Sequence, residues 1–488
     1  MTVEEGQIKA LLKSSSKAAD VIREHVEDGG LVRVESHLDA DGLAAAGIIG
    51  VALNRLGARF IIRIERWLDE QVVESLSSGK QDLTIFTDMG SGYLDILSEG
   101  LSEKNVIILD HHQPVGEPPE TFIQVNPHVH GIDGSRELSG AGVTYLVAKS
   151  LNEKNIDLSH LGVVGALGDL QDKHEGRRLG GVNSIIVEDA IEADLLEVER
   201  DLLLFGRETR PIHKALAYTT NPFIPGISGE EDKSLALLST LGIKTKDGDR
   251  WRALRDLSKD EKRRLFSGIA DYMVSKGLQS EVAMSLIGMV YTLKREEPWT
   301  PLRDAREFAV LLNATGRMGK NGLGVAICMG DRGRCLQEAN QVLEEYRLTI
   351  TKYLNWLDEN PDRIEELNNI YVVHGGRSID EKVISTISTM ILPNLPNPEK
   401  PLIAYSIIPD EDYIKVSARA SYTVIEKGVN LGEILHSASE RFSGEGGGHD
   451  VAAGAYIPAK EMDSFIKYVD ELVGKQLAEG TKRSGDGG

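Results

Sequence analysis

The chain has 488 residues, enough for two or three domains with substantial hydrophobic cores. Its 55 basic and 76 acidic residues give a formal net charge of -21 at pH 7, which argues against a general nucleic-acid binder with a basic surface. Only two cysteines occur, Cys328 and Cys335, so a disulfide framework and a cysteine-rich zinc site are excluded. The N-terminus lacks a signal-peptide core and no apolar stretch could span a bilayer, so we expect a cytoplasmic protein with no membrane partner.

The first 195 residues alternate between strand-like and helix-like segments. Amphipathic spacing predicts a helix at residues 7–25, and a second, apolar helix is expected at residues 43–56. Strands are expected at residues 31–35, 59–65, 82–87, 106–109 and 122–125. Ser139 should cap a helix that runs to about Leu151. This alternation predicts an α/β fold with a parallel sheet and helices on both faces.

Acidic and imidazole side chains follow three of these strands at the point where each ends. They are His37, Asp39 and Asp41 in ESHLDADG, Asp88 in TIFTDMGSG, and Asp110, His111 and His112 in VIILDHHQP. Parallel strands bring their carboxyl ends to one edge of a sheet, where such folds bind ligands. Oxygen and imidazole ligands without cysteine suit Mn²⁺ or Mg²⁺, and are compatible with Zn²⁺. The sequence therefore predicts a two-metal hydrolase in which Asp88 is placed to bridge the ions.

Each of these motifs also has a purely structural interpretation. A lone aspartate after a strand is often only a turn or helix cap, and adjacent histidines commonly lie on the surface. The joint occurrence at three strand ends favours a site. A fourth segment, LGVVGALGDLQD at residues 161–172, adds Asp169 and Asp172 as further candidate ligands.

Beyond about residue 191 the sequence changes character. Residues 202–220 are predicted to be helical, and residues 232–294 are charged and helix-prone with little strand signal. Apolar spacing predicts one long helix over residues 339–357. Strands at residues 370–373, 402–408 and 413–418 indicate a second α/β domain. The expected domains are a catalytic domain at 1–195, a helical linker or insert at 196–300, a smaller C-terminal substrate-binding domain at 301–475 and a disordered tail at 476–488.

The segment GEGGGHDVAAGA at residues 444–455 has the composition of an anion site. Gly446, Gly447 and Gly448 would let backbone N–H groups approach an anion, and His449 adds a donor. Arg419 could pair with a phosphate, and VAAGA is expected to start a helix. The alternative is a flexible surface turn. Asn313 and Arg317 are weaker phosphate-contact candidates, because a turn at Asn-Ala-Thr-Gly explains them nearly as well.

Together these motifs resemble a known family. The series HxDxDG, TD, DHH and a later aspartate resembles the DHH phosphoesterase superfamily, with DHH present at residues 110–112. GGGH and KVSARAS (residues 415–421) resemble segments of the DHH-associated C-terminal domain. The length and LLNATGRMGKNGLGVAICMGDR at residues 311–332 are most similar to archaeal RecJ-like nucleases, a branch that includes the GINS-associated nuclease of the replisome.

The resemblance implies a site for two ions, Mn²⁺ with Mg²⁺ as the alternative. One ion would be bound by His37, Asp39 and Asp88, and the other by Asp41, Asp88, His111 and Asp169. It also implies that His112 faces the scissile phosphate and that Asp110 orients the neighbouring imidazole or contributes to the metal shell. Asp169 is preferred over Asp172 because it follows the small-residue run GALG.

The resemblance further implies an exonuclease on single-stranded DNA or RNA, connected with DNA replication or repair, whose C-terminal domain closes over the strand. GINS or other replisome proteins are the expected partners. Two alternatives stay open. The negative charge favours a phosphoesterase of small substrates such as nanoRNA, cyclic dinucleotides or a phosphorylated nucleotide. A replisome scaffold with secondary nuclease activity is the other.

Overall fold

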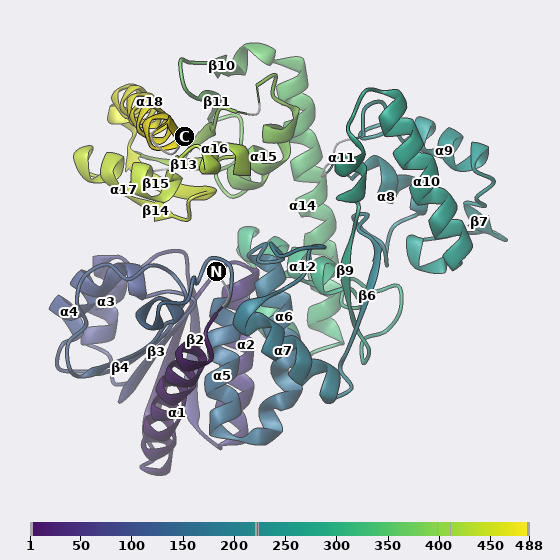
Figure 1. Cartoon of the computed structure of the whole chain (residues 1–488). Coiled ribbons are helices and arrows are strands. Elements are labelled where there is room, and N and C mark those ends of the chain that lie inside the picture. Colours follow the sequence, from purple (N-terminus) through teal and green to yellow (C-terminus); the bar gives the residue numbers. More distant parts are fainter. Residues whose placement is uncertain (1–2, 220–221, 223, 398, 410, 486–488) are drawn as a thin grey trace. The chain divides into compact units, whose positions relative to one another are not determined.

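The computed structural model describes residues 3–219, 222, 224–397, 399–409 and 411–485 (Figure 1). The chain divides into two compact units, Met1–Leu343 and Glu344–Gly488, and each is described by itself. No helix among the described residues is both long and apolar enough to cross a membrane.

The first unit is built on a five-stranded parallel sheet with strand order β2-β1-β3-β4-β5. The strands are β1 (Leu31–His37), β2 (Arg59–Glu65), β3 (Leu83–Thr87), β4 (Asn105–Leu109) and β5 (Phe122–Val125). All five predicted strands are confirmed. β3 is buried at every position, which explains why its sequence shows a continuous apolar run instead of alternation.

Helices cover both faces of this sheet. α2 (Ala40–Arg55) packs against β1, β2 and β3, and α5 (Gly140–Leu151) packs against β3 and β4. α3 (Glu70–Ser77) and α4 (Leu94–Leu101) enclose Phe86 and Ile108 on the other face. α1 (Glu5–Glu27) packs against α5 and β5, and α6 (Ser159–Gly168) against α2 and α5. α7 (Gly181–Glu192) completes this layer beside α6. The predicted α/β class is confirmed.

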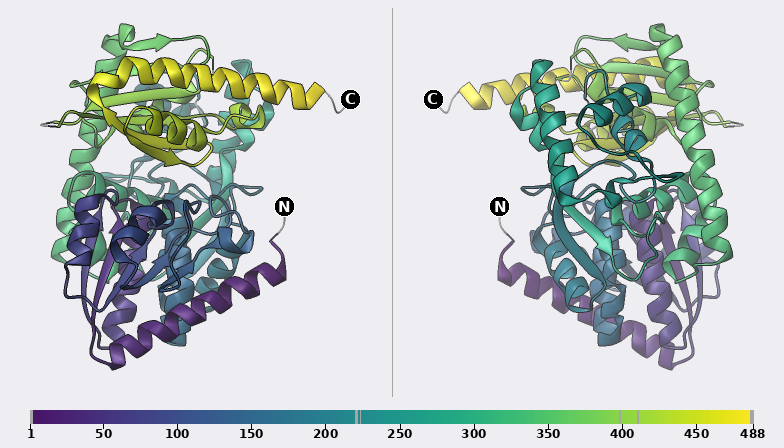
Figure 2. Two further views of the ribbon diagram at one scale, coloured as in Figure 1. Left: turned by 90° about the vertical axis from the view of Figure 1, so that its left-hand side faces the viewer. Right: turned by 90° about the vertical axis from the view of Figure 1, so that its right-hand side faces the viewer.

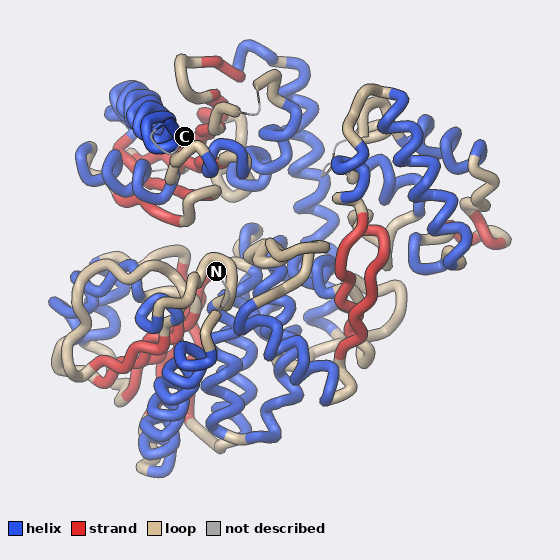
Figure 3. Tube along the Cα trace, in the orientation of Figure 1, coloured by secondary structure: helices blue, strands red, loops and turns tan. Residues whose placement is uncertain are grey.

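An insert follows, carried on a two-stranded ribbon that Figure 3 shows in red. β6 (Leu196–Leu202) pairs antiparallel with β9 (Ile287–Leu293). Between them lie α8 (Ile212–Ala217), α9 (Glu231–Thr240), the short strands β7 (Lys246–Asp247) and β8 (Arg250–Trp251), α10 (Lys259–Ser275) and α11 (Ser280–Met284). The insert is helical as expected, but the ribbon was missed and the helix expected at 202–220 is reduced to α8. Partners about ninety residues apart leave no local signal of their pairing.

Residues 301–343 belong with the first unit, whereas the sequence assigned them to the C-terminal domain. α12 (Ala305–Arg317) and α13 (Asn321–Cys328) pack against α2. The Asn-Ala-Thr-Gly segment lies inside α12, so a turn there was wrong. α14 (Arg334–Glu359) confirms the predicted long helix. The other domain boundaries stay predictions.

The second unit contains a six-stranded sheet with strand order β10-β11-β12-β13-β15-β14. Its strands are β10 (Ile364–Glu366), β11 (Tyr371–Gly376), β12 (Leu402–Ile407), β13 (Tyr413–Arg419), β14 (Glu445–Gly448) and β15 (Ala452–Pro458). β11 and β12 pair in parallel, and the other neighbours are antiparallel. VAAGA therefore leads into a strand that begins at Ala452, and the expected helix start was wrong, because pairing with β13 and β14 outweighs the helix propensity of alanine.

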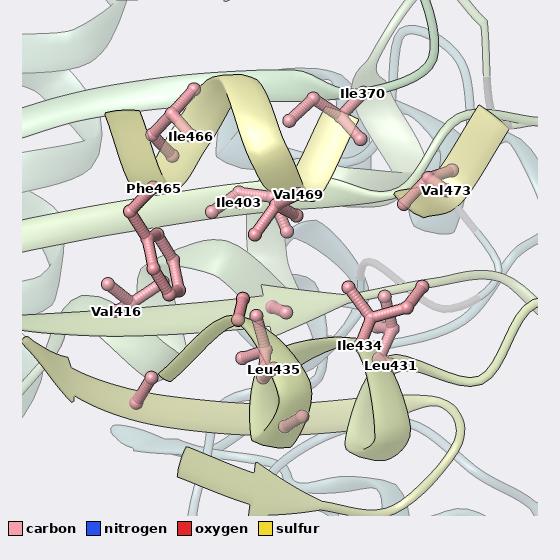
Figure 4. Packing of buried hydrophobic residues seen from close by; sticks show 14 of the residues in the cluster. Ile370, Ile403, Val416, Leu431, Ile434, Leu435, Phe465, Ile466, Val469 and Val473 are labelled. Carbon is pink, nitrogen blue, oxygen red and sulfur yellow. The ribbon is translucent and has the colours of Figure 1, made fainter. Parts of the chain in front are cut away.

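Helices complete the second unit: α15 (Ile384–Ile391), α16 (Tyr422–Glu426), α17 (Leu431–Arg441) and α18 (Met462–Gly485). In Figure 4, Phe465 of α18 lies beside Val416 and Val469 lies beside Ile403 of the sheet, and Leu435 of α17 belongs to the same core. Figure 2 (left) shows the long α18 along this unit. α18 continues to Gly485, where a disordered tail was expected from residue 476, and its apolar residues spaced four apart pack on the core as far as Leu477. Residues 486–488 lie outside the described residues.

Candidate metal centre

The predicted ligands converge at the carboxyl edge of the parallel sheet. His37 ends β1, Asp39 caps α2, Asp88 follows β3, and residues 110–112 follow β4. Three groups can be distinguished, and within each group the candidate ligand atoms lie within 4.8 Å of one another. The groups are His37, Asp39 and Asp88; Asp41, His111 and Asp169; and Asp88, Asp110, His111 and His112. Segments more than a hundred residues apart thus meet at one site, as the topology of an open α/β sheet requires.

The turn after β1 is fixed by backbone and side-chain contacts. The Asp39 carboxylate accepts a hydrogen bond from the N–H of Gly42 at 3.1 Å and caps α2. A Cβ at Gly42 would lie 2.3 Å from the carbonyl oxygen of His37, so only glycine fits. Ser36 Oγ donates to the carbonyl of Gly42 and accepts from Thr87 Oγ1, each at 2.7 Å. These contacts connect the end of β1 to the end of β3.

Asp88 lies between two imidazoles. Its Oδ1 is 3.2 Å from Nε2 of His111, and its Oδ2 is 3.7 Å from Nδ1 of His37. The side chain is almost fully buried, and within the described part of the chain neither oxygen has a partner with hydrogen-bond geometry. Its backbone is left-handed, with φ of 57°. Two buried carboxylate oxygens that face different imidazoles fit a bridge between two cations.

Asp41 is held by the start of α5. Its oxygens accept hydrogen bonds from the N–H groups of Gly140 at 2.6 Å and Ala141 at 3.0 Å. The helix N-terminus carries partial positive charge, which stabilises the fully buried carboxylate. The small residues after Ser139 let the helix end approach closely, since a Cβ at Gly140 would lie 2.5 Å from Asp88 Oδ1.

His111 presents Nε2 to the acidic cluster. Its Nδ1 is 2.7 Å from the carbonyl oxygen of Gly134, which can only accept, so Nδ1 carries a proton. Nε2 lies 3.2 Å from Asp169 and 3.2 Å from Asp88. Burial opposes the charged imidazole, but Asp169 and Asp88 raise the pKa of His111 well above its ordinary value. A divalent ion bound at Nε2 would take the place of the second proton, which the charged imidazole carries on that nitrogen.

Asp110 orients His112. One Asp110 oxygen lies 2.8 Å from Nδ1 of His112 and also accepts from the N–H of His111, while the other accepts from the N–H of Ser91. Burial opposes both charges, yet the neighbouring imidazole lowers the pKa of Asp110 below its usual range, and Asp110 raises the pKa of His112. Asp110 therefore favours the charged form of His112, whose ring is partly exposed.

The structure separates the two candidate aspartates of the fourth segment. Asp169 ends α6 with its Oδ2 3.2 Å from His111. Asp172 instead pairs with Arg177 at 2.9 Å and with Arg306 at 2.8 Å. A carboxylate neutralised by two guanidinium groups is a structural ion pair, so Asp169 is the member of the cluster.

Burial and carboxylate repulsion govern the titration of the centre. Burial, followed by the charges of Asp88 and Asp169, raises the pKa of Asp41 well above its usual range. Burial would lower the pKa of His37, but Asp39 and Asp88 raise it to about 10. Burial likewise opposes ionisation of Asp39, but the His37 charge holds its pKa well below the ordinary value. A nearby cation would offset the burial and repulsion that raise the pKa of Asp41, and the donor set of carboxylates and imidazoles fits divalent ions.

α12 contacts the ligand turn, which connects the weaker sequence candidates to the site. Asn313 Oδ1 accepts a hydrogen bond from the N–H of Ala40 at 3.0 Å. A Cβ at Gly316 would lie 1.8 Å from the carbonyl oxygen of Leu38, so the helix touches this turn directly. The charge of Arg317 also contributes to the low pKa of Asp39. Gly134 and Gln171, which position His111, carry no motif and were missed.

The candidate anion-binding residues gather at one end of the sheet of the second unit. Arg419 ends β13 opposite Ala452, and His449 follows β14 in the turn to β15. Arg419 Nε donates to Thr389 Oγ1 at 3.0 Å. The flexible-turn interpretation was wrong, because the three glycines lie in β14. A Cβ at Gly446 would lie 2.1 Å from Ser439 Oγ, and Gly448 has φ of 137°, whereas Gly447 faces open space.

Three family models match successive parts of the chain. The DHH family, N-terminal domain, matches residues 31–165, which include all of the first sheet and every predicted metal ligand except Asp169. The DHH-CID domain matches residues 204–287 in the insert. The DHHA1 domain matches residues 368–475 in the second unit.

Similar proteins extend this result. An uncharacterised protein of Methanocaldococcus jannaschii is 34% identical over 473 residues, covering 96% of this chain and 99% of that protein. The single-stranded-DNA-specific exonuclease RecJ of Thermus thermophilus is 28% identical over 249 residues, 47% of this chain but only 35% of that protein. A crystal structure of exonuclease RecJ bound to manganese shares the fold, with a TM-score of 0.55 and 18% identity, covering 96% of each chain. The chain therefore belongs to the DHH superfamily and is a RecJ-like member of it.

Proposed function

We propose that this protein is a two-metal phosphodiesterase that removes nucleotides from an end of single-stranded DNA or RNA. The observation that carries the proposal is the position of Asp88, whose two buried oxygens face His111 and His37. A structural aspartate would have hydrogen-bond donors at this depth. A carboxylate between two groups of nitrogen and oxygen ligands is what a pair of ions requires.

The proposed ligands divide into two sets that share Asp88. One set is His37, Asp39 and Asp88, and the other is Asp41, His111 and Asp169, which Asp88 joins through its contact with His111. Bound divalent ions would lower the pKa of a water molecule and neutralise charge on phosphate oxygens. We propose Mn²⁺ as the ion, with Mg²⁺ as the alternative, because two imidazoles among carboxylates favour Mn²⁺ over a cation that prefers oxygen.

His112 is the proposed catalytic residue outside the metal ligands. Asp110 holds its Nδ1, so Nε2 is the ring nitrogen that can donate to a phosphate oxygen or a leaving oxygen. Burial opposes the charged imidazole, but the Asp110 carboxylate raises the pKa of His112 and so favours the protonated ring that this role needs. Arg419, His449 and the backbone at Gly447 are proposed to contact the phosphates of the strand.

The experiment that tests this function compares a long and a short substrate in each metal. A uniformly labelled strand of about twenty nucleotides, as DNA and as RNA, and a dinucleotide are incubated after exhaustive dialysis against chelator. We expect no hydrolysis in chelator, restoration by Mn²⁺ above Mg²⁺, and stepwise shortening of the long strand. Hydrolysis that persists unchanged in excess chelator rules out the metal mechanism.

The same assay decides the main alternative, a phosphoesterase of small substrates. The net charge of -21 favours a short substrate, because few phosphates need few basic contacts. Rapid cleavage of the dinucleotide with no shortening of the long strand would establish that alternative. Association with GINS and a role in replication or repair stay predictions, to be tested by purification of the native complex.

A further inference from the structure

The insert carries a basic and aromatic segment that contrasts with the acidic chain. Residues 244–264 contain nine basic and five acidic residues, within a protein of net charge -21. Some of these charges are neutralised locally, since Arg252 pairs with Glu261, and Lys262 with Asp201. Lys244, Lys246, Arg250, Lys259, Arg263 and Arg264 are exposed.

Two of the four tryptophans of the chain lie on this part of the molecule and are exposed. Trp251 is 40% exposed and Trp299 is 53% exposed. Trp299 has a left-handed backbone, with φ of 60°, which is unusual for an aromatic residue. The two rings lie near each other, since Arg250, the neighbour of Trp251, contacts Trp299, and grouped exposed apolar side chains are typical of interaction surfaces.

Cationic groups lie against both rings. Lys246 Nζ is 4.4 Å from the centre of the Trp251 ring, and the two residues are paired across β7 and β8. The guanidinium groups of Arg250 and Arg255 lie 4.9 and 4.8 Å from the centre of the Trp299 ring. Asp256 accepts a hydrogen bond from Trp299 Nε1 at 3.2 Å and lies 3.3 Å from Arg250. These contacts hold Trp299 and Arg250 in place.

A hollow of about 490 Å³ extends this surface along α9. It is lined by Leu235, Ser239, Ile243, Lys244, Thr245 and Lys246. Apolar carbons and two ammonium groups around one hollow suit a flat, partly apolar group that carries a negative charge. A nucleotide has both properties, in its base and its phosphate.

We propose that this tryptophan surface, formed by Trp251, Trp299, Lys244, Lys246 and Arg250, binds single-stranded nucleic acid. Bases would stack on the indole rings and on the guanidinium plane of Arg250, while Lys244 and Lys246 contact phosphates. The inference rests on the proposed nuclease function and narrows its substrate to strands long enough to occupy this surface. It also explains how a chain of strongly negative charge binds a polyanion, because the basic contacts are concentrated locally.

Binding is measured separately from hydrolysis, on the full chain in chelator. The probe is a labelled thirty-nucleotide strand, followed by fluorescence anisotropy and by quenching of tryptophan emission. We expect strong quenching in the wild type and about a tenfold loss of affinity for each of Trp251→Ala and Trp299→Ala, from loss of stacking. The Lys244→Glu/Lys246→Glu variant should weaken binding and lower the salt dependence.

Val274→Ala is the matched control, because Val274 is 53% exposed on α10 of the same insert but lies outside the tryptophan surface. Trp251→Phe and Trp299→Phe keep an aromatic face and should restore most of the affinity even if the alanine variants fold poorly. Hydrolysis of a tetranucleotide should be unchanged in all of these variants. Unchanged affinity of a folded Trp251→Ala/Trp299→Ala protein for the thirty-nucleotide strand would overturn the inference.

Two further outcomes separate this inference from the proposed function. If the wild type binds the long strand through the tryptophans but hydrolyses no strand in any metal, the function fails and the surface stands. If a twenty-residue polyglutamate displaces the strand as well as an unlabelled strand of equal charge does, the surface recognises acidic polypeptide and the inference fails.

Discussion

His111 and Gln171 are joined through one carbonyl group. The Gly134 oxygen lies 2.7 Å from Nδ1 of His111 and 2.9 Å from Nε2 of Gln171, and both nitrogens donate to it. The other end of the Gln171 amide accepts from Asn183 Nδ2 at 2.7 Å, and Gln171 is fully buried. The chain Asn183, Gln171, Gly134 therefore fixes the ring orientation of His111 and aims Nε2 at Asp88 and Asp169.

Gln171→Leu should therefore lower activity about 10- to 100-fold, the scale found for residues that orient metal ligands. The ring of His111 would lose its fixed carbonyl partner, and Asn183 would lose an acceptor in the interior. Gln171→Glu separates the two effects, because it still accepts from Asn183 but cannot donate to Gly134. Metal titration and steady-state kinetics on both variants test whether Gln171 positions His111. Equal activity of Gln171→Leu and wild type at limiting metal would contradict the positioning role.

Asp88→Ala should abolish hydrolysis, with a loss of at least about a hundredfold, because both proposed ions lose a shared ligand. The fold should survive, since removal of one carboxylate relieves repulsion among Asp41, Asp88 and Asp169 in the absence of metal. Calorimetric titration should show lost or weakened metal binding. Asp95→Ala, an exposed carboxylate of α4, is the control. Near-normal turnover by metal-saturated Asp88→Ala would refute the two-metal assignment.

Glu307 should make the protein less stable as the pH rises. Burial, and then the charge of Asp304, raises the pKa of Glu307 from 4.5 to about 7. The folded state therefore binds this proton more tightly than the unfolded state. Its contribution is fully present below about pH 4.5 and is lost as the pH rises through about 7. The loss should be on the order of 2–3 kcal/mol.

Urea unfolding of metal-free wild type and Glu307→Gln at pH 5 and pH 8 measures this contribution. The variant should lose less stability between the two pH values, because its amide does not titrate. It also loses one hydrogen bond, since Glu307 accepts from the N–H of Glu208 and from Thr209 Oγ1, so the absolute stabilities need not rank in the same order. Parallel pH profiles for the two proteins would show that Glu307 does not titrate in this range.

Arg419→Ala and His449→Ala should weaken substrate binding about 10- to 100-fold while leaving metal binding and the fold intact. A lost charge-assisted hydrogen bond to phosphate costs about 1.5–3 kcal/mol. Gly447→Ala is a sharper probe, because its Cβ would face open space in the free protein. It should leave stability unchanged and reduce affinity only where a strand approaches that backbone. Single-turnover kinetics and metal titration test all three, and a variant that loses metal but keeps substrate affinity contradicts this division of roles.

The sequence by itself determined which site residues follow which strands. His37, Asp88 and His111 each follow an apolar strand in the chain, so a parallel sheet must bring them to one edge. Local periodicity also sufficed for the five strands of the first sheet and for α14. Short-range patterns of hydrophobicity fix which residues face a core before any long-range contact is known.

Tertiary structure decided what depends on partners distant in the sequence. Asp172 is removed from the cluster by Arg306, which is 134 residues away. The ribbon of β6 and β9, the packing of α12 on α2, and the strand conformation of VAAGA each depend on a neighbour that local propensity does not encode. The contact of the Gly134 carbonyl with His111 also depends on a neighbour that local propensity does not encode. Such contacts involve ordinary residues whose role comes from position alone, because burial and pairing outweigh the small differences in intrinsic propensity.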